Sequence, residues 1–148
     1  LDASLEVNDS QPLIVVEMAR ERLGILKGKK ITVLGLAFKP DTDDIRESRS
    51  EVVIKKLLEE GAIVTGHDPE AMTNFKEISD IKMCNNALEA LSEADCLILM
   101  TEWQEYINLD YKLIKQKMSG NVIIDGRRAF DYRRMEVVGF DYKAIGLG

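Results

Sequence analysis

The chain has 148 residues, enough for one domain whose hydrophobic core needs neither a disulfide nor a metal to hold it. Apolar residues make up 45% and charged residues 31%, a composition typical of a folded globular protein rather than a disordered one. The net charge of −6 excludes broad nucleic-acid binding, which needs a basic surface, but leaves room for a small local phosphate site.

No apolar run approaches the roughly 18 residues of a membrane helix, and residues 1–6 show no signal-peptide pattern. Cys84 and Cys96 have no metal-ligand spacing, and Cys96 is expected to be a buried hydrophobe. We therefore expect no membrane partner, no metal and a cytoplasmic location. Because the first residue is Leu1 rather than Met, we allow for functional residues on upstream sequence.

A helix is the first predicted element. Residues 8–12 offer capping side chains and end in Pro12, which suits a first helical turn. Apolar residues then recur at helical spacing, at Val16, Ala19, Leu23 and Leu26. The helix should end within residues 24–28, and its apolar stripe would pack on the following domain or on one upstream.

From residue 30 onward, short apolar runs alternate with helical patterns. Strands are predicted at 31–36, 62–66, 81–84, 94–100, 121–125 and 142–145. Helices are predicted before Gly61, at 69–77, around Leu88, at 111–118 and at 130–138. The alternation predicts an α/β fold: a Rossmann-like parallel sheet with helices on both faces, preceded by an N-terminal helix.

Ligands of such sheets bind beyond the carboxyl ends of the strands, so the segments after the strands are the candidates. The first of them lacks a dinucleotide fingerprint, because Gly35 is followed by Leu, Ala and Phe rather than by GxGxxG, and no P-loop is present. A self-contained NAD site is therefore not expected. Lys39, in the same loop, either contacts a ligand or is solvated.

Residues 41–44 hold three acids without the spacing of a calcium-binding loop. A polar loop with local turns, capped by Ser48 or Ser50, is the simpler interpretation. Arg46 can be held by one of these acids and still offer donors to a phosphate.

Asp68 lies where dinucleotide folds bind a ribose, but without the glycines a turn-capping role is favoured, and His67 is expected to be structural. The aromatic segment 101–106 would stack a base or, more simply, pack over the sheet end. Arg127 and Arg128 emerge at the carboxyl edge, where they suit a diphosphate or pair with acids. No nucleophile–base pattern is present, so no catalytic residue is assigned to this chain.

Residues 35–48, Gly-Leu-Ala-Phe-Lys-Pro-Asp-Thr-Asp-Asp-Ile-Arg-Glu-Ser, closely resemble the opening of the C-terminal domain of UDP-glucose 6-dehydrogenases and their nucleotide-sugar relatives. Further matches follow in order at Gly61-Ala62, Asp68-Pro69, 101–103, 125–127 and 139–146. The resemblance makes residues 29–148 a UDP-sugar-binding domain. Residues 1–28 then look like a linker and a remnant of the family's central dimerisation helices.

The resemblance implies a division of labour in which an NAD-binding domain and a catalytic cysteine lie on upstream sequence. Phe38, Lys39 and Arg127 would contact the UDP-sugar substrate, and Arg46 would reach toward NAD. Arg128 falls where relatives vary and is treated as structural. The fragment alone is expected to be inactive.

The implied function is substrate binding in an NAD-dependent nucleotide-sugar 6-dehydrogenase that oxidises UDP-glucose to UDP-glucuronate by four electrons, as a homodimer or higher homo-oligomer. Three alternatives stay open: a UDP-N-acetylhexosamine or GDP-mannose dehydrogenase domain, a stand-alone nucleotide-binding regulatory module, and a flavodoxin-like receiver. The arginines and lysine of the strand-end loops argue against the receiver.

Overall fold

The structure is a computed structural model that describes residues 3–46 and 48–146, with side chains described from Pro12 onward. Its centre is a six-stranded parallel sheet in the order β3-β2-β1-β4-β5-β6. The strands are β1 (Lys30–Leu34), β2 (Ile63–His67), β3 (Lys82–Met83), β4 (Cys96–Leu99), β5 (Val122–Asp125) and β6 (Asp141–Ala144). The predicted fold class is confirmed. The order is that of doubly wound dinucleotide-binding folds, which rules out the receiver topology.

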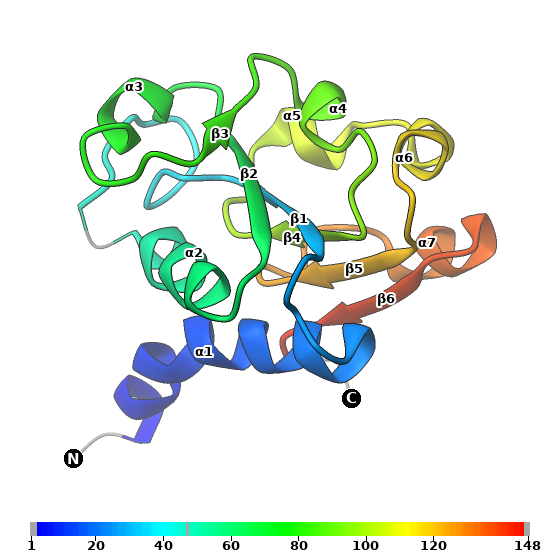
Figure 1. The fold of residues 1–148 in the computed structure, drawn as a ribbon, viewed down its shortest axis with the longest axis horizontal. Helices are drawn as coiled ribbons and strands as arrows, with labels where there is room; N and C mark the ends of the chain where they lie inside the picture. The colour runs from blue at the N-terminus through cyan, green and yellow to red at the C-terminus, as the bar shows by residue number, and fades with distance from the viewer. Residues whose placement is uncertain (1–2, 47, 147–148) are drawn as a thin grey trace.

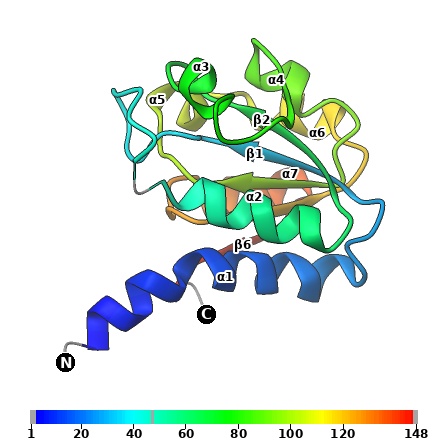
Figure 2. The same ribbon diagram turned by 60° about the vertical axis from the view of Figure 1, so that its left-hand side comes forward.

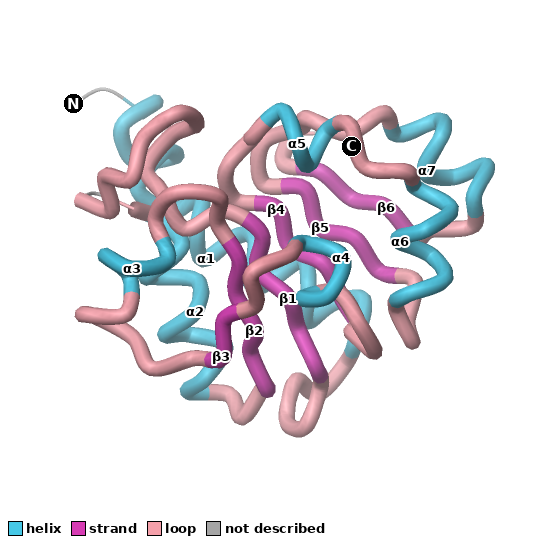
Figure 3. Tube along the Cα trace, turned by 90° about the horizontal axis from the view of Figure 1, so that it is seen from above, coloured by secondary structure: helices cyan, strands magenta, loops and turns pink. Residues whose placement is uncertain are grey.

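Helices cover both faces of the sheet. On one face α1 (Ala3–Leu23) and α2 (Arg49–Glu59) lie side by side, and on the other lie α4 (Ala87–Ala90) and α6 (Tyr111–Lys117) (Figures 1 and 2). The remaining helices are α3 (Met72–Phe75), α5 (Gln104–Ile107) and α7 (Tyr132–Val138). Seen from above, the strands run side by side between these two layers (Figure 3).

The core lies along the central strands because helices screen them from water on both sides. Every residue of β4 and of β5 is buried, and Leu97, Ile98 and Ile123 have no exposed surface. This explains why both strands are continuous apolar runs rather than alternating ones. Cys96 is fully buried as predicted, and burial raises the pKa of its thiol far above the usual range.

The first helix begins earlier than the sequence predicts. It starts at Ala3, so Pro12 lies inside the helix and not in its first turn; the predicted start at residues 8–12 is wrong. A proline inside a helix removes one backbone hydrogen bond and kinks the axis without ending the helix. Figure 2 shows the first half of α1 running at an angle to the second half.

The second half of α1 packs on this sheet, which decides between the two partners that the sequence left open for its apolar stripe. Val15, Val16 and Ala19 are buried in the common core. Arg20 forms ion pairs with Glu17 and with Glu60 at the end of α2, and its hydrogen bond lowers the pKa of Glu60. The second half of α1 is therefore part of the core of this domain.

Most of the other predicted elements form within a few residues of their predicted bounds. The exception is α5, which the sequence does not predict. It is a single turn of four residues whose Tyr106 is fully buried. One turn is too short to show a helical period, and tertiary packing alone defines it.

We predict that Gly35→Ala destabilises the fold more than Gly24→Ala, its matched control. Both glycines have positive φ, at +101° and +78°, where a side chain costs about 1–2 kcal/mol. A Cβ at Gly24 would meet nothing within 4 Å, whereas one at Gly35 would lie 2.5 Å from the backbone nitrogen of Thr101. Urea unfolding should therefore show a further loss of about 1–3 kcal/mol for Gly35→Ala. Equal losses would mean that the contact with Thr101 relaxes freely.

Candidate functional site

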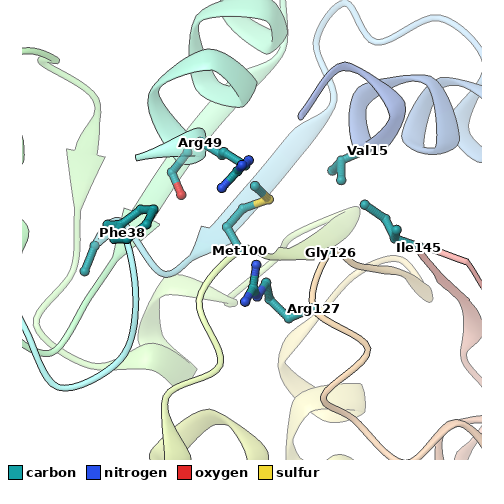
Figure 4. Close-up of a pocket in the computed structure, with 9 residues that line it drawn as sticks. Val15, Phe38, Arg49, Met100, Gly126, Arg127 and Ile145 are labelled. Atoms are coloured by element: carbon teal, nitrogen blue, oxygen red, sulfur yellow. The ribbon is translucent and has the colours of Figure 1, made fainter. Parts of the chain in front are cut away.

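A small pocket opens at the carboxyl edge of the sheet, around the point where the strand order reverses between β1 and β4. Its lining residues come from α1, from the start of α2 and from the segments after β1, β4, β5 and β6: Val15, Ala37, Phe38, Arg49, Ser50, Met100, Gly126, Arg127 and Ile145. In Figure 4, Arg49 and Arg127 approach it from opposite sides. The pocket thus combines an apolar wall with cationic side chains.

Hydroxyl side chains hold the loop after β1 in place. Three successive backbone carbonyls accept hydroxyl hydrogen bonds. The carbonyl of Gly35 accepts from Ser50 (2.6 Å), that of Leu36 from Ser48 (2.8 Å), and that of Ala37 from Thr101 (2.8 Å). Ser48, one of the two serines predicted for this role, also caps α2. The loop therefore enters the pocket with its carbonyl groups already paired, which fixes the backbone before Phe38.

Asp68 supplies the matching acceptors for the backbone N–H groups. Its carboxylate is fully buried and accepts from the N–H of Leu36 (2.7 Å) and Ala37 (2.9 Å), and from the indole of Trp103 (3.2 Å). The other oxygen accepts from the N–H of Glu70 and Ala71, which confirms the predicted turn-capping role. A fully buried carboxylate is out of reach of a ribose.

His67 and Tyr106 are buried beside Asp68 and play structural parts. The His67 Nδ1 lies 2.8 Å from the Tyr106 hydroxyl, and burial lowers the pKa of the imidazole. Trp103 and Tyr106 are 8% and 0% exposed, so this aromatic segment packs over the sheet end rather than offering a ring to a ligand. The structure thus agrees with the structural role expected for His67 and with the packing role expected for the aromatic segment 101–106.

A second buried carboxylate shapes the turn after β5. Asp125 accepts from the backbone N–H of Arg127, Ala129 and Phe130, each at 2.9 Å, and from the Tyr142 hydroxyl at 2.6 Å. Burial, followed by this hydrogen bond, raises the pKa of Tyr142 above its usual range. The turn is tight enough to hold Arg128 at a φ of +54°. It delivers Arg127 to the pocket.

Gly126, at the start of the same turn, permits a close approach to β4. A Cβ at Gly126 would lie 2.8 Å from the Leu99 carbonyl oxygen and 3.2 Å from the Met100 sulfur. Glycine is required here by contact rather than by φ. This explains why a glycine precedes the arginine in the Asp-Gly-Arg sequence.

Glu102 fixes the side chain of Arg127. The Nε and Nη2 atoms of the guanidinium lie 3.0 and 2.9 Å from one carboxylate oxygen of Glu102. Both side chains are about one-third exposed, at 36% and 30%, so solvent screens the pair and it adds little to stability. Its effect is to orient the guanidinium, which points into the pocket in Figure 4.

The structure brings together two of the four predicted binding residues. Phe38 and Arg127 line one pocket, although they follow different strands. Lys39 and Arg46 lie outside its lining. Arg46 is bound to Asp44, and this hydrogen bond lowers the pKa of the Asp44 carboxyl to about 2. That ion pair confirms the expectation that an acid of the loop holds Arg46.

The local turns predicted for the acidic loop agree with the structure. The N–H of Asp44 donates to Thr42 and that of Arg46 to Asp44, which are the local turns expected. Among the described residues, no cluster of His, Cys, Asp or Glu could hold a metal ion. Nor does any helix in the described ranges have the length and apolar character needed to cross a membrane.

Arg49 lines the pocket and was missed by the sequence analysis. It is the first residue of α2, directly after the Ser48 cap, and an arginine at that place resembles an ordinary surface residue. The available signal was its position: a helix that starts after the first strand of a doubly wound sheet begins at the carboxyl edge. The N-terminal end of such a helix also favours anions.

Together, the topology and the pocket define a class: a Rossmann-like domain with arginines lining a pocket at its switch point. Comparisons with known proteins agree. A sequence model described as "UDP-glucose/GDP-mannose dehydrogenase family, UDP binding domain" matches residues 32–132. The chain belongs to this family and corresponds to that domain.

Relatives with known names support the assignment. The chain is 42% identical over 146 residues to the UDP-glucose 6-dehydrogenase AglM of Haloferax volcanii, covering 98% of this chain and 32% of the relative. It is 43% identical over 126 residues to a UDP-glucose 6-dehydrogenase of Rhizobium meliloti, covering 83% of this chain and 28% of the relative. The chain thus spans about a third of the length of the curated relatives it matches.

Solved structures show the same fold. A UDP-glucose dehydrogenase of Pyrobaculum islandicum superposes with a TM-score of 0.83 at 36% identity, over 97% of this chain and 31% of that one. An NDP-N-acetyl-D-galactosaminuronic acid dehydrogenase of Methanosarcina mazei also reaches 0.83, at 32% identity, over 95% of this chain and 30% of that one.

We predict that Tyr142→Phe destabilises the chain by about 1.5–3 kcal/mol, the range of a hydrogen bond to a charged group. The substitution removes only the hydroxyl that donates to the buried Asp125. Tyr132→Phe is the matched control, because Tyr132 is 40% exposed and accepts a hydrogen bond from Arg133 at the surface. Urea unfolding should show a loss below about 0.5 kcal/mol for the control. Similar losses for both would show that the Tyr142–Asp125 hydrogen bond adds no more stability than a bond at the surface.

Proposed function

We propose that this chain is the UDP-sugar-binding domain of an NAD-dependent nucleotide-sugar 6-dehydrogenase. The observation that carries the proposal is the switch-point pocket, in which the Arg127 guanidinium and the Phe38 ring stand at the place where doubly wound sheets bind ligands. Arginine binds phosphate groups through paired N–H donors, and an aromatic ring offers a surface for the uridine or sugar. The family match supports a UDP ligand.

The proposed contacts extend beyond the pocket itself. We assign Phe38, Lys39 and Arg127 to the UDP-sugar, and Arg46 to NAD. Lys39 and Arg46 lie on the loop that continues from Phe38, and the Arg46 side chain is 86% exposed, so an extended ligand or a second ligand can meet them at the mouth. Solvent-facing cations on a fixed loop are suited to closing a cleft against another domain.

In the part of the chain that the structure describes, the loop after β1 does not form a dinucleotide cradle. The N–H groups of Leu36 and Ala37, which would face a pyrophosphate, donate to Asp68, and α2 starts only at Arg49. We therefore propose that NAD binds mainly outside this chain, together with the catalytic residues. The part of this chain is to hold the nucleotide end, so that binding energy places the sugar for oxidation.

UDP-glucose is the sugar nucleotide we favour, because the relatives in the sequence comparison are named UDP-glucose 6-dehydrogenases. The equal TM-scores of structures named for two different sugars show that the fold does not select the sugar. We further propose a cytoplasmic homo-oligomer. The free thiols of Cys84 and Cys96 suit a reducing compartment, and Leu13 and Ile14 of α1 are 48% and 39% exposed.

The decisive experiment measures NADH formation by the full-length protein with UDP-glucose, two UDP-N-acetylhexosamines and GDP-mannose. We expect turnover of UDP-glucose with two NADH per sugar, because oxidation of a primary alcohol to a carboxylate removes four electrons. Turnover of only one of the other sugar nucleotides would identify that compound, and not UDP-glucose, as the substrate. Binding of UDP without oxidation of any of them would favour a regulatory nucleotide-binding module.

In the same protein, Arg127→Ala should weaken UDP-sugar binding by about 1.5–3 kcal/mol, the range for a charged hydrogen bond. Arg133→Ala, on an exposed arginine of α7, is the matched control and should bind as the wild type does.

The two loop cations should differ in which ligand they affect. Lys39→Ala should weaken binding of the sugar nucleotide, whereas Arg46→Ala should raise the KM for NAD more than the KM for the sugar nucleotide. The opposite pattern for Arg46 would refute its assignment.

A further inference from the structure

Glu102 engages one edge of the Arg127 guanidinium. A guanidinium carries five N–H donors in a rigid plane. The Nε atom of Arg127 donates to the Oε2 atom of Glu102 at 3.0 Å, and the Nη2 atom lies 2.9 Å from the same oxygen. An oxygen on this edge does not reach the donors on Nη1, which form a second edge together with Nη2. The ion pair therefore fixes the plane of the guanidinium and leaves a second edge of paired donors.

The backbone that carries Glu102 is held on both sides. Thr101, which precedes it, is buried and donates its hydroxyl hydrogen bond to the Ala37 carbonyl. Trp103, which follows it, is also buried and donates its indole N–H to the Asp68 carboxylate. Glu102 thus stands on a fixed segment, although its own side chain is 30% exposed.

The backbone of Arg127 is held independently. The buried carboxylate of Asp125 accepts its N–H at 2.9 Å. An arginine side chain loses rotamer freedom when a ligand immobilises it, and this loss weakens binding. An ion pair between two fixed segments removes part of that freedom before the ligand arrives. Glu102 stands outside the lining of the pocket, to which Arg127 belongs, so it acts on a ligand there through Arg127 (Figure 4).

We infer that Glu102 is a positioning residue for the nucleotide sugar: it turns the Nη1–Nη2 edge of Arg127 toward the pocket, where that edge donates two parallel hydrogen bonds to the diphosphate. The inference rests on the proposed function and adds to it a residue outside the predicted binding set. Glu102 is also a negative charge beside an anionic ligand. Removing its oxygen acceptor and removing its charge therefore have opposite effects, which the test separates.

The test measures the dissociation constant of UDP by calorimetry on the full-length protein. Glu102→Ala removes the acceptor and should weaken UDP about three- to tenfold, because the ligand must then order Arg127 itself. Glu102→Gln keeps an oxygen acceptor on a side chain of the same length and should bind UDP within about twofold of the wild type. Glu105→Ala removes the same charge from an exposed residue of α5 and should bind UDP as the wild type does.

Two further measurements distinguish positioning from a general structural role. In a protein that already carries Arg127→Ala, adding Glu102→Ala should change the dissociation constant no further, because the side chain that Glu102 holds is gone. Urea unfolding of Glu102→Ala should match that of the wild type, since the ion pair is solvent-exposed.

The outcomes separate this inference from the proposed function. If Glu102→Ala binds UDP like the wild type while Arg127→Ala binds it weakly, the UDP site stands and the positioning role is refuted. Tighter binding by Glu102→Ala would show that Glu102 competes with the ligand, and equal losses for the Ala and Gln variants would show that its charge matters rather than its acceptor; both refute the role. If the wild type itself binds no UDP, the proposed function fails, and the inference fails with it.

Discussion

The organisation of this domain depends on the buried carboxylate of Asp68. It joins the ends of three strands, because it sits at the end of β2, accepts two N–H groups of the loop after β1, and accepts the indole N–H of the segment after β4. A loop that leaves a parallel sheet has no neighbouring strand to pair with, and buried backbone groups left unpaired are costly. Asp68 pairs these N–H groups at the edge of the sheet where the pocket lies.

Other side chains pair the remaining backbone groups at this edge of the sheet. Ser48, Ser50 and Thr101 donate to the three carbonyls of the same loop. Asp125 repeats the arrangement after β5, with four hydrogen bonds that set the turn of Arg127. The pocket-lining side chains therefore stand on backbone whose polar groups are paired, and the exposed cations Lys39 and Arg46 lie further along the same loop. This division suits a domain that holds a nucleotide firmly and meets other domains at its rim.

The pairing of these groups also explains the sequence motifs. The serines after Arg46, the Asp-Pro pair, the threonine before Glu102 and the Asp-Gly-Arg turn all bear hydrogen bonds or close contacts within one edge of the sheet. Residues that look like ligand candidates because of their type, such as Asp68 and His67, prove to be internal supports. Only some residues of these sequence motifs line the pocket.

The sequence by itself determined the α/β class, nearly every strand, a helix cap at either Ser48 or Ser50, the turn cap at Asp68, and the edge at which Phe38 and Arg127 meet. These follow from local periodicity, from turn chemistry and from the geometry of parallel sheets. Only the tertiary structure decided that Pro12 lies inside a helix, that α5 exists, that Glu102 holds Arg127 and that Arg49 faces it. The physical reason is separation along the chain. Glu102 and Arg127 are 25 residues apart, and no local pattern records which distant side chains a folded sheet brings into contact.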